Sequence, residues 1–327
     1  MKRFAAFREL GTVVLIVLAM VVAGIREPRF FKPESLSNIL LYAPLLIVVG
    51  IGQMMVIVTR GIDVSVGSMV GISAMTVGML FKAQPHMPLP LGVGVGILAG
   101  LLLGSLNGVL IAGVRIPPII VTLGGLSAYR GLLFFICQGH QIDANFVPDG
   151  LTYWSQAGPI TIAGLTISWV FCIAIAGALA AAWFLQRTRA GRDIYVLGSN
   201  PEAARLRGVP VRRTTFSVYA ITGALCGLAG ALYLSRYGVV NPGSAGKGME
   251  LVVIAAVVIG GTNVAGGSGS VLGVVLGCLL LGTISNALAV AGIDENWQQL
   301  TYGIIILVAV VVDTATKRAL AKRLEAA

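Results

Sequence analysis

The sequence predicts an all-α protein, a polytopic transmembrane helical bundle of about ten helices with its N- and C-termini in the cytoplasm. Hydrophobic residues make up 57% of the 327 residues and charged residues only 11%, whereas soluble domains carry roughly 25% charged residues. Several apolar stretches also reach the length of about 20 residues that a helix needs to cross a bilayer. These stretches do not alternate in polarity as transmembrane β-strands do, so we expect helices.

Ten apolar segments can be delimited along the chain. The first has a basic start like a signal peptide, but it lacks a clear cleavage site of small residues, so we expect a retained span. The eighth is too short to span alone and ends in glycines, which predicts a broken or re-entrant helix that faces protein or a water-filled cavity. The segments are 10–24, 38–59, 64–81, 90–113, 117–137, 167–185, 215–234, 251–261, 270–291 and 300–312.

Lysines and arginines cluster in three regions of the chain. They occur in the N-terminal segment 2–8, in the loop 186–214 and in the C-terminal segment 317–323. Because loops rich in these residues stay in the cytoplasm, we expect all three to be cytoplasmic. Six spans precede the basic loop and four follow it, and both numbers are even, as this orientation requires. The loop 138–159, expected outside, has no Lys or Arg.

The same composition excludes several classes of function. The net charge of +10 is better explained by topology signals than by nucleic-acid binding. The four cysteines and two histidines show no spacing typical of metal ligands, so we expect no metal site and no intramembrane enzyme. No phosphate-binding GxxxxGK[ST] motif occurs, and no loop could hold an ATPase domain. We expect one transmembrane domain, 1–327, that binds no cofactor itself.

The basic loop, 187–213, contains the pattern of a short capped helix. Asn200 is a favourable N-cap, Pro201 a favourable first residue, and Glu202 in the first turn suits the helix dipole. Gly208 is placed to end the helix after about two turns. Two adjacent alanines would leave its surface smooth enough for another protein to approach, although an ordinary loop helix explains the pattern equally well. The candidate contact residues are Gly198, Asn200, Glu202, Ala203, Ala204, Arg205 and Gly208.

Polar residues within or beside the spans are candidates for a translocation pathway or gate. Arg60 and Asp63 are three positions apart at the inner membrane edge and could pair across a helical turn or contact a partner. Arg130 could extend to the outer interface, make structural hydrogen bonds or line a pathway. For the uncharged residues, hydrogen bonds between helices are the ordinary alternative. The candidates are Gln53, Arg60, Asp63, Ser65, Ser68, Asn107, Thr122, Arg130, Glu250 and Asn286.

Several motifs resemble one family of transport proteins. The pattern Asn-x-x-Ala-Ala-x-x-x-Gly at 200–208 resembles the coupling helix of ABC importer permeases, which docks into a groove on an ATPase subunit. The segments 59–68, 121–131, 248–261 and 266–270 resemble the signatures of ribose-type sugar permeases, in the family's order and across most of the chain. Permeases for autoinducer-2 and for rhamnose are the nearest resemblance.

The resemblance implies a permease subunit, and not an enzyme, of a bacterial importer in the inner membrane. Such importers move a monosaccharide or a related polyol-like solute, and they combine two permeases, identical or related, with two ATPase domains that hold ATP and Mg²⁺ and with a periplasmic substrate-binding protein. The alternative is a secondary transporter driven by an ion gradient. The scarcity of ionisable residues in the middle of the spans counts against that alternative.

Overall fold

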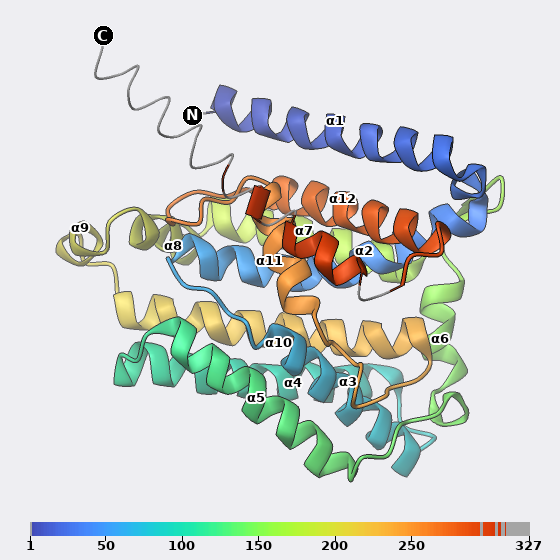
Figure 1. Ribbon diagram of the computed structural model, residues 1–327. Helices are drawn as coiled ribbons and strands as arrows, with labels where there is room; N and C mark the ends of the chain where they lie inside the picture. The colour runs from blue at the N-terminus through green and yellow to red at the C-terminus, as the bar shows by residue number, and fades with distance from the viewer. Residues whose placement is uncertain (1, 295–296, 305–306, 309–310, 312–327) are drawn as a thin grey trace.

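The computed structural model describes residues 2–294, 297–304, 307–308 and 311, and it confirms a polytopic helical bundle (Figure 1). Within this described part, eight helices are long and apolar enough to cross a membrane. They are α1 (Lys2–Arg26), α2 (Pro33–Val58), α3 (Val66–Ala83), α4 (Leu89–Gly108) with its π-helical extension η2 (Val109–Val114), α5 (Pro118–Cys137), α7 (Trp169–Arg187), α10 (Val211–Tyr237) and α12 (Val271–Val290).

Shorter elements connect these helices. The eighth predicted segment is the helix α11 (Met249–Ile259), whose 11 residues are too few to span, as the sequence indicated. The tenth predicted segment, 300–312, lies partly outside the described residues, and the basic segment 317–323 lies wholly outside them. The other elements are η1 (Pro28–Phe31), η3 (Ala144–Phe146), α6 (Asp149–Gln156), α8 (Arg189–Ser199), α9 (Pro201–Leu206) and the antiparallel hairpin of β1 (Ile160–Ile162) and β2 (Leu165–Ile167).

The helix α2 forms the centre of the bundle. Every residue from Ala43 to Val58 is buried, because α7, α10, α11 and α12 all pack around it. The sequence fits this place, since the run is apolar on all sides and contains Gln53 as its one polar side chain. The helix α1, in contrast, packs mainly against α12 and leaves most of its apolar surface exposed.

Glycines bring α4 and α10 into close contact. A Cβ atom at Gly100 would overlap the carbonyl oxygen of Gly223, and one at Gly223 would overlap the carbonyl oxygen of Gly100. One turn away, a Cβ atom at Gly227 would overlap the carbonyl oxygen of Gly96. Small residues at such positions let two helix backbones approach and gain packing contacts that lipid cannot supply. The pair α4–α10 therefore fixes α10, whose two ends reach the two functional regions described below.

Two non-helical segments lie beside the start of α3 inside the bundle. Residues 59–65 join α2 to α3 without regular secondary structure, and residues 238–248 lead from α10 into α11. The second segment touches α3 directly, since a Cβ atom on Gly246 would overlap the carbonyl oxygen of Gly67, the second residue of α3. Non-helical backbone at membrane depth is tolerated where protein or a water-filled cavity surrounds it. The first turns of α3 and α11 thus lie next to each other within the bundle.

Candidate coupling surface and translocation pathway

The short helix α9 begins as its sequence predicts. The side-chain Oδ1 of Asn200 accepts hydrogen bonds from the backbone N–H groups of Glu202 and Ala203, both at 3.0 Å. Pro201 is the first helical residue, and Gly208 follows the helix with φ of +79°. The cap satisfies two of the N–H groups that a helix start leaves free. The sequence did not predict α8, the eleven-residue helix that precedes α9.

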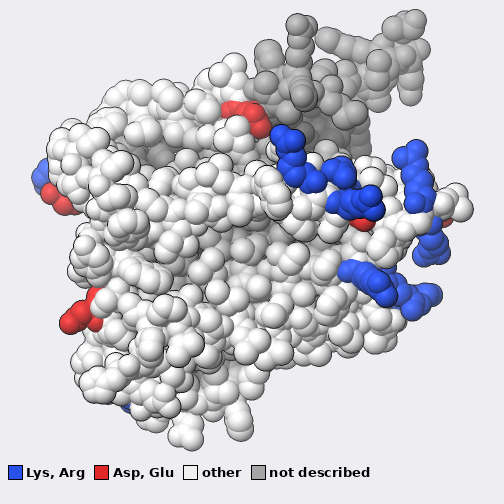
Figure 2. Space-filling view, turned by 180° about the vertical axis from the view of Figure 1, so that it is seen from behind, with Lys and Arg blue, Asp and Glu red and all other residues white. Residues whose placement is uncertain are grey.

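The pair α8–α9 projects from one end of the bundle, which we call the coupling end (Figure 1). Leu206 is 89% exposed there, while Ala204 is completely buried. Of the two alanines expected to form a smooth surface, Ala204 therefore faces inward, and Ala203 is half-buried. Figure 2 shows Lys and Arg side chains gathered at this end. The exposed arginines of α7 to α10 here are Arg187, Arg189, Arg192, Arg205, Arg207, Arg212 and Arg213.

Arg60 connects the coupling end to the bundle. Its Nε and one terminal nitrogen donate hydrogen bonds of 2.6 Å to the backbone carbonyls of Gly198 and Ser199, the last residues of α8. The predicted pairing of Arg60 with Asp63 across a helical turn is wrong. The helix α2 ends at Val58, and Arg60 adopts a left-handed conformation with φ of +67°. The turn that would have aligned the two side chains is therefore absent.

Glycines make this junction possible. A Cβ atom at Gly198 would overlap the carbonyl oxygen of Val58, and Gly267, which has φ of +79°, donates its N–H to the same carbonyl at 2.9 Å. The hydroxyl of Tyr195 donates to the carbonyl of Gly269 at 3.1 Å. Burial raises the pKa of the Tyr195 phenol, which favours the protonated donor form. The end of α8, the end of α2 and the loop before α12 thus form one packed joint.

The non-helical segment 59–65 leads from this joint to a buried polar network. The carboxylate of Asp63 accepts hydrogen bonds from the backbone N–H and the hydroxyl of Ser65, at 2.9 and 2.6 Å. Asn107 of α4 donates to the Ser65 hydroxyl at 2.9 Å, and Tyr129 of α5 donates to Asn107 Oδ1 at 2.7 Å. Buried polar groups need such partners. The network joins the segment 59–65 to α4 and α5.

Two further predicted residues hold the backbone of this segment. With its amide group oriented to satisfy both atoms, Gln53 donates to the carbonyl of Asp63 at 3.0 Å and accepts from its N–H at 3.2 Å. Thr122 donates to the carbonyl of Ile62 at 3.1 Å. These bonds replace the ladder that a continuous helix would have supplied. Gln53 and Thr122 therefore support the unwound segment.

Charged side chains flank the place where α3 and α11 begin. Arg130 of α5 donates to the backbone carbonyls of Ala245 and Pro242, at 2.7 and 3.4 Å, so it makes the structural hydrogen bonds that were one of its predicted roles. Glu250 in the first turn of α11 approaches Gly67, where a Cβ atom would overlap its carboxylate. One Glu250 oxygen, Oε2, has no hydrogen-bond partner among the described residues. Ser68 donates to the carbonyl of Leu126 at 2.9 Å.

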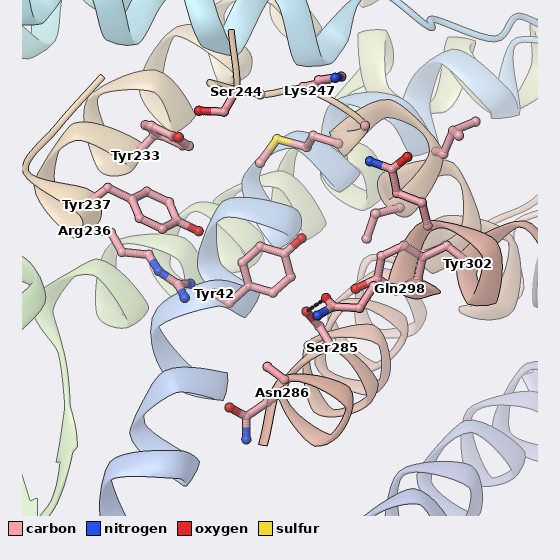
Figure 3. A pocket seen from close by; sticks show the side chains of 18 of the residues that line it. Tyr42, Tyr233, Arg236, Tyr237, Ser244, Lys247, Ser285, Asn286, Gln298 and Tyr302 are labelled. Atoms are coloured by element: carbon pink, nitrogen blue, oxygen red, sulfur yellow. Dashed lines mark hydrogen bonds between the residues drawn. The ribbon is translucent and has the colours of Figure 1, made fainter. Parts of the chain in front are cut away.

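A cavity of about 550 Å³ opens at the end of the bundle opposite to α8–α9, which we call the far end. It lies between the start of α2, the end of α10, the start of α11 and the later part of α12 (Figure 3). Four tyrosines and two cations line it together with uncharged polar side chains. Its volume is within the ~300–1,000 Å³ of small-molecule sites. The four tyrosines and two cations of the cavity are Tyr42, Tyr233, Tyr237, Tyr302, Arg236 and Lys247.

The predicted site residues therefore fall into three groups. The residues of the coupling loop gather at the coupling end, and most of the polar residues gather around the segment 59–65 or the start of α11. Asn286 lies apart, since it lines the far-end cavity and donates to Ser35 at 2.8 Å.

Sequence reasoning missed the tyrosines of the cavity and Arg236. A signal existed, because tyrosines recur near segment ends, but tyrosines there are typical of any membrane interface. No group of three potential metal ligands occurs among the described residues.

Comparisons with known proteins identify the family of the chain. Residues 35–310 match the family described as branched-chain amino acid transport system / permease component. The protein named autoinducer 2 import system permease protein LsrC in Klebsiella pneumoniae subsp. pneumoniae is 35% identical over 98% of this chain and 91% of its own. Proteins of the same name are 34% identical in Escherichia coli K12 / DH10B, over 97% and 90%, and in Yersinia pestis Pestoides F, over 96% and 87%. The chain therefore belongs to this family of permease components, and it is a multi-pass transport subunit of the inner membrane and not an enzyme.

Proposed function

We propose that this chain is the permease of an ABC importer that moves a small sugar-like solute, such as autoinducer-2, rhamnose or a ribose-like sugar, into the cell. The relatives named as autoinducer 2 import permeases support the solute class. In this proposal the coupling end faces the cytoplasm and the far end faces the periplasm, in agreement with the arginines clustered around α8 and α9.

The junction made by Arg60 is the observation that carries the mechanism. Its two hydrogen bonds connect the last turn of α8 to the segment 59–65, and Asp63 and Ser65 connect that segment to α4 and α5. A displacement of α8–α9 therefore pulls directly on non-helical backbone inside the bundle. An ATPase that moves α8–α9 would change the packing at the start of α3 and α11. Alternating access requires an element that can adopt two arrangements, and in this proposal the segment 59–65 is that element.

The proposal assigns partners to both ends. An ATPase subunit, which holds ATP and Mg²⁺, docks on α8–α9, and a periplasmic binding protein delivers the solute at the far end. A second permease, identical or related, completes the assembly in the lipid bilayer. This chain contributes no catalytic residue.

Replacing Leu206 by Asp tests the docking surface. Leu206 is 89% exposed, so the substitution places a charge on α9 without disturbing the core. We expect the ATPase to be lost when the tagged chain is purified from its native membrane, because a charge in an apolar contact is not paired. Ile162→Asp in the β-hairpin, where Ile162 is 67% exposed, is the matched control and should retain the ATPase. Retention of both ATPase and uptake by Leu206→Asp would refute the docking assignment.

Ala203→Trp provides a second test on the same helix. Ala203 is half-buried, so a bulky side chain there should block docking while insertion into the membrane stays normal. Ala204 is unsuitable for this purpose because it is fully buried, and a large side chain there would disturb the fold itself.

The alternative, coupling to an ion gradient, has one observation in its favour. Asp63 and Glu250 each have a buried carboxylate oxygen without a hydrogen-bond partner among the described residues, and buried acids are typical of ion-coupled transporters. Uptake by proteoliposomes separates the two mechanisms. We expect uptake to require internal ATP together with the ATPase and the binding protein. Uptake by the permease alone, driven by a proton or sodium gradient, would favour the alternative.

A further inference from the structure

The far-end cavity has a pronounced charge asymmetry. Arg236 and Lys247 are its cationic side chains, and no Asp or Glu is among its described lining residues. Lys247 is exposed at the mouth, whereas Arg236 reaches the cavity from the last turn of α10. Two cations without a carboxylate in one concave site favour the binding of an anion.

Arg236 is held in place and yet keeps hydrogen-bonding capacity. Its guanidinium lies 5.1 Å from the ring centroid of Tyr42 and 4.9 Å from that of Tyr237, so two aromatic rings fix its position by cation–π contacts. One terminal nitrogen, Nη1, is buried and has no hydrogen-bond partner among the described residues. A buried N–H group without a partner is costly, and an ionised oxygen would satisfy it best.

The remaining surface of the cavity suits hydroxyl groups. Figure 3 shows Tyr42 and Arg236 on one side, with Ser285, Gln298 and Tyr302 facing them from the other. The Ser285 hydroxyl donates to Gln298 Oε1 at 3.5 Å, which is a weak hydrogen bond. A ligand hydroxyl could make shorter hydrogen bonds to both side chains. Uncharged hydrogen-bonding groups and aromatic rings together recognise polyhydroxylated compounds by weak polar bonds and by packing.

We propose that the far-end cavity binds a small polyhydroxylated compound that carries a phosphate or carboxylate, with Arg236 and Lys247 on the anionic group. The same chemistry occurs in a free sugar phosphate or sugar acid and in the glycerol phosphate headgroup of phosphatidylglycerol. The inference does not depend on the proposed import function, because it concerns binding by this chain alone.

Binding to the purified full chain in phosphatidylcholine nanodiscs tests the proposal. The probes are ribose 5-phosphate and ribonate, with ribose as their neutral counterpart, and affinity is measured by calorimetry. We expect both anionic probes to bind at least about tenfold more tightly than ribose, since charge-assisted bonds are about twice as strong as neutral ones. Equal affinity for ribose and the anionic probes, or no binding of either anionic probe, would overturn it.

Substitutions locate the binding in the cavity. Arg236→Gln should lower the affinity for the anionic probes about tenfold or more, and Arg236→Lys should recover part of that affinity. Lys247→Gln should lower the affinity severalfold. Because Lys247 is exposed, its variant is expected to fold even if Arg236→Gln does not. Lys82→Gln is the matched control, since Lys82 also lies over an aromatic ring, that of Phe146, but does not line the cavity. Unchanged affinity in both Arg236→Gln and Lys247→Gln would refute the assignment.

Nanodiscs with phosphatidylglycerol distinguish the two sources of the anion. If the lipid headgroup occupies the cavity, this lipid should weaken the binding of ribose 5-phosphate and should remain attached to the wild-type chain in native mass spectrometry but not to Arg236→Gln. If a free solute occupies it, the affinity for ribose 5-phosphate should not change with the lipid. Either result supports an anion site, and the result obtained identifies the natural occupant of the cavity.

Discussion

At the scale of single residues, the junction between α8 and the bundle requires a glycine, because no side chain fits at this position. A Cβ atom at Gly198 would overlap the carbonyl oxygen of Val58, the acceptor that Gly267 uses. We expect Gly198→Ala to force the two backbones apart, to cost about 1–3 kcal/mol as other overpacked sites do, and to abolish uptake while the chain still inserts. Thermal unfolding in detergent and uptake in cells measure the two effects.

Gly177→Ala is the control for this prediction. Gly177 lies in α7, and a Cβ atom there would meet nothing within 4 Å. Alanine favours a helix more than glycine does, so we expect equal or slightly higher stability and normal uptake. A Gly198→Ala variant as stable and active as Gly177→Ala would show that the joint tolerates separation.

The hydroxyl of Tyr129 gives a second prediction at this scale. It donates to the side-chain oxygen of Asn107, which in turn donates to Ser65. Tyr129→Phe would leave a buried amide oxygen without its donor, which costs about 1–3 kcal/mol. We expect a lower unfolding temperature than in Tyr153→Phe, whose tyrosine is 57% exposed in α6. Identical unfolding temperatures for the two variants would mean that the network around Ser65 contributes no stability.

At the scale of elements, Arg60 is the connection between α8–α9 and the segment 59–65. We expect Arg60→Gln to bind the ATPase normally, because the docking surface is intact, but to transport at least about tenfold more slowly, because a charged hydrogen bond contributes roughly 1.5–3 kcal/mol. Arg115→Gln is a close control: Arg115 also has a left-handed conformation, with φ of +68°, and is exposed after η2. Copurification and uptake are measured on the same preparations. Normal uptake by Arg60→Gln would remove Arg60 from the mechanism.

The elements also show how far sequence reasoning reaches. Hydropathy and length are local properties, so the spans and the shortness of α11 could be predicted, as could the cap at Asn200. The joint could not, because Arg60 and Gly198 are 138 positions apart and nothing local indicates that they meet. A pairing of Arg60 with Asp63 was one of two expected roles and needed a helical turn between them, and the end of α2 at Val58 removes that geometry.

At the scale of the whole molecule, the bundle has two chemically different ends. The coupling end carries exposed arginines and the apolar Leu206, while the far end carries the tyrosine-lined cavity and the β-hairpin. The buried polar network around Asp63 lies between them. Because α2 and the pair α4–α10 are tightly packed, they resist deformation, so we expect a change of shape between the two ends to occur mainly in the non-helical segments 59–65 and 238–248.

The orientation of this polarity in the membrane is the last prediction. The arginines around α8 and α9 predict that the coupling end lies in the cytoplasm. We introduce a single cysteine at Arg207 or at Ile162, both exposed, and label with a membrane-impermeant maleimide. Of the four native cysteines, Cys137, Cys226 and Cys278 are buried and Cys172 is half-buried, so the unmodified chain measures the background. We expect Ile162→Cys to react in intact spheroplasts and Arg207→Cys to react only in inverted vesicles. Labelling of Arg207→Cys in intact spheroplasts would reverse the orientation and place α8–α9 where no ATPase could reach it.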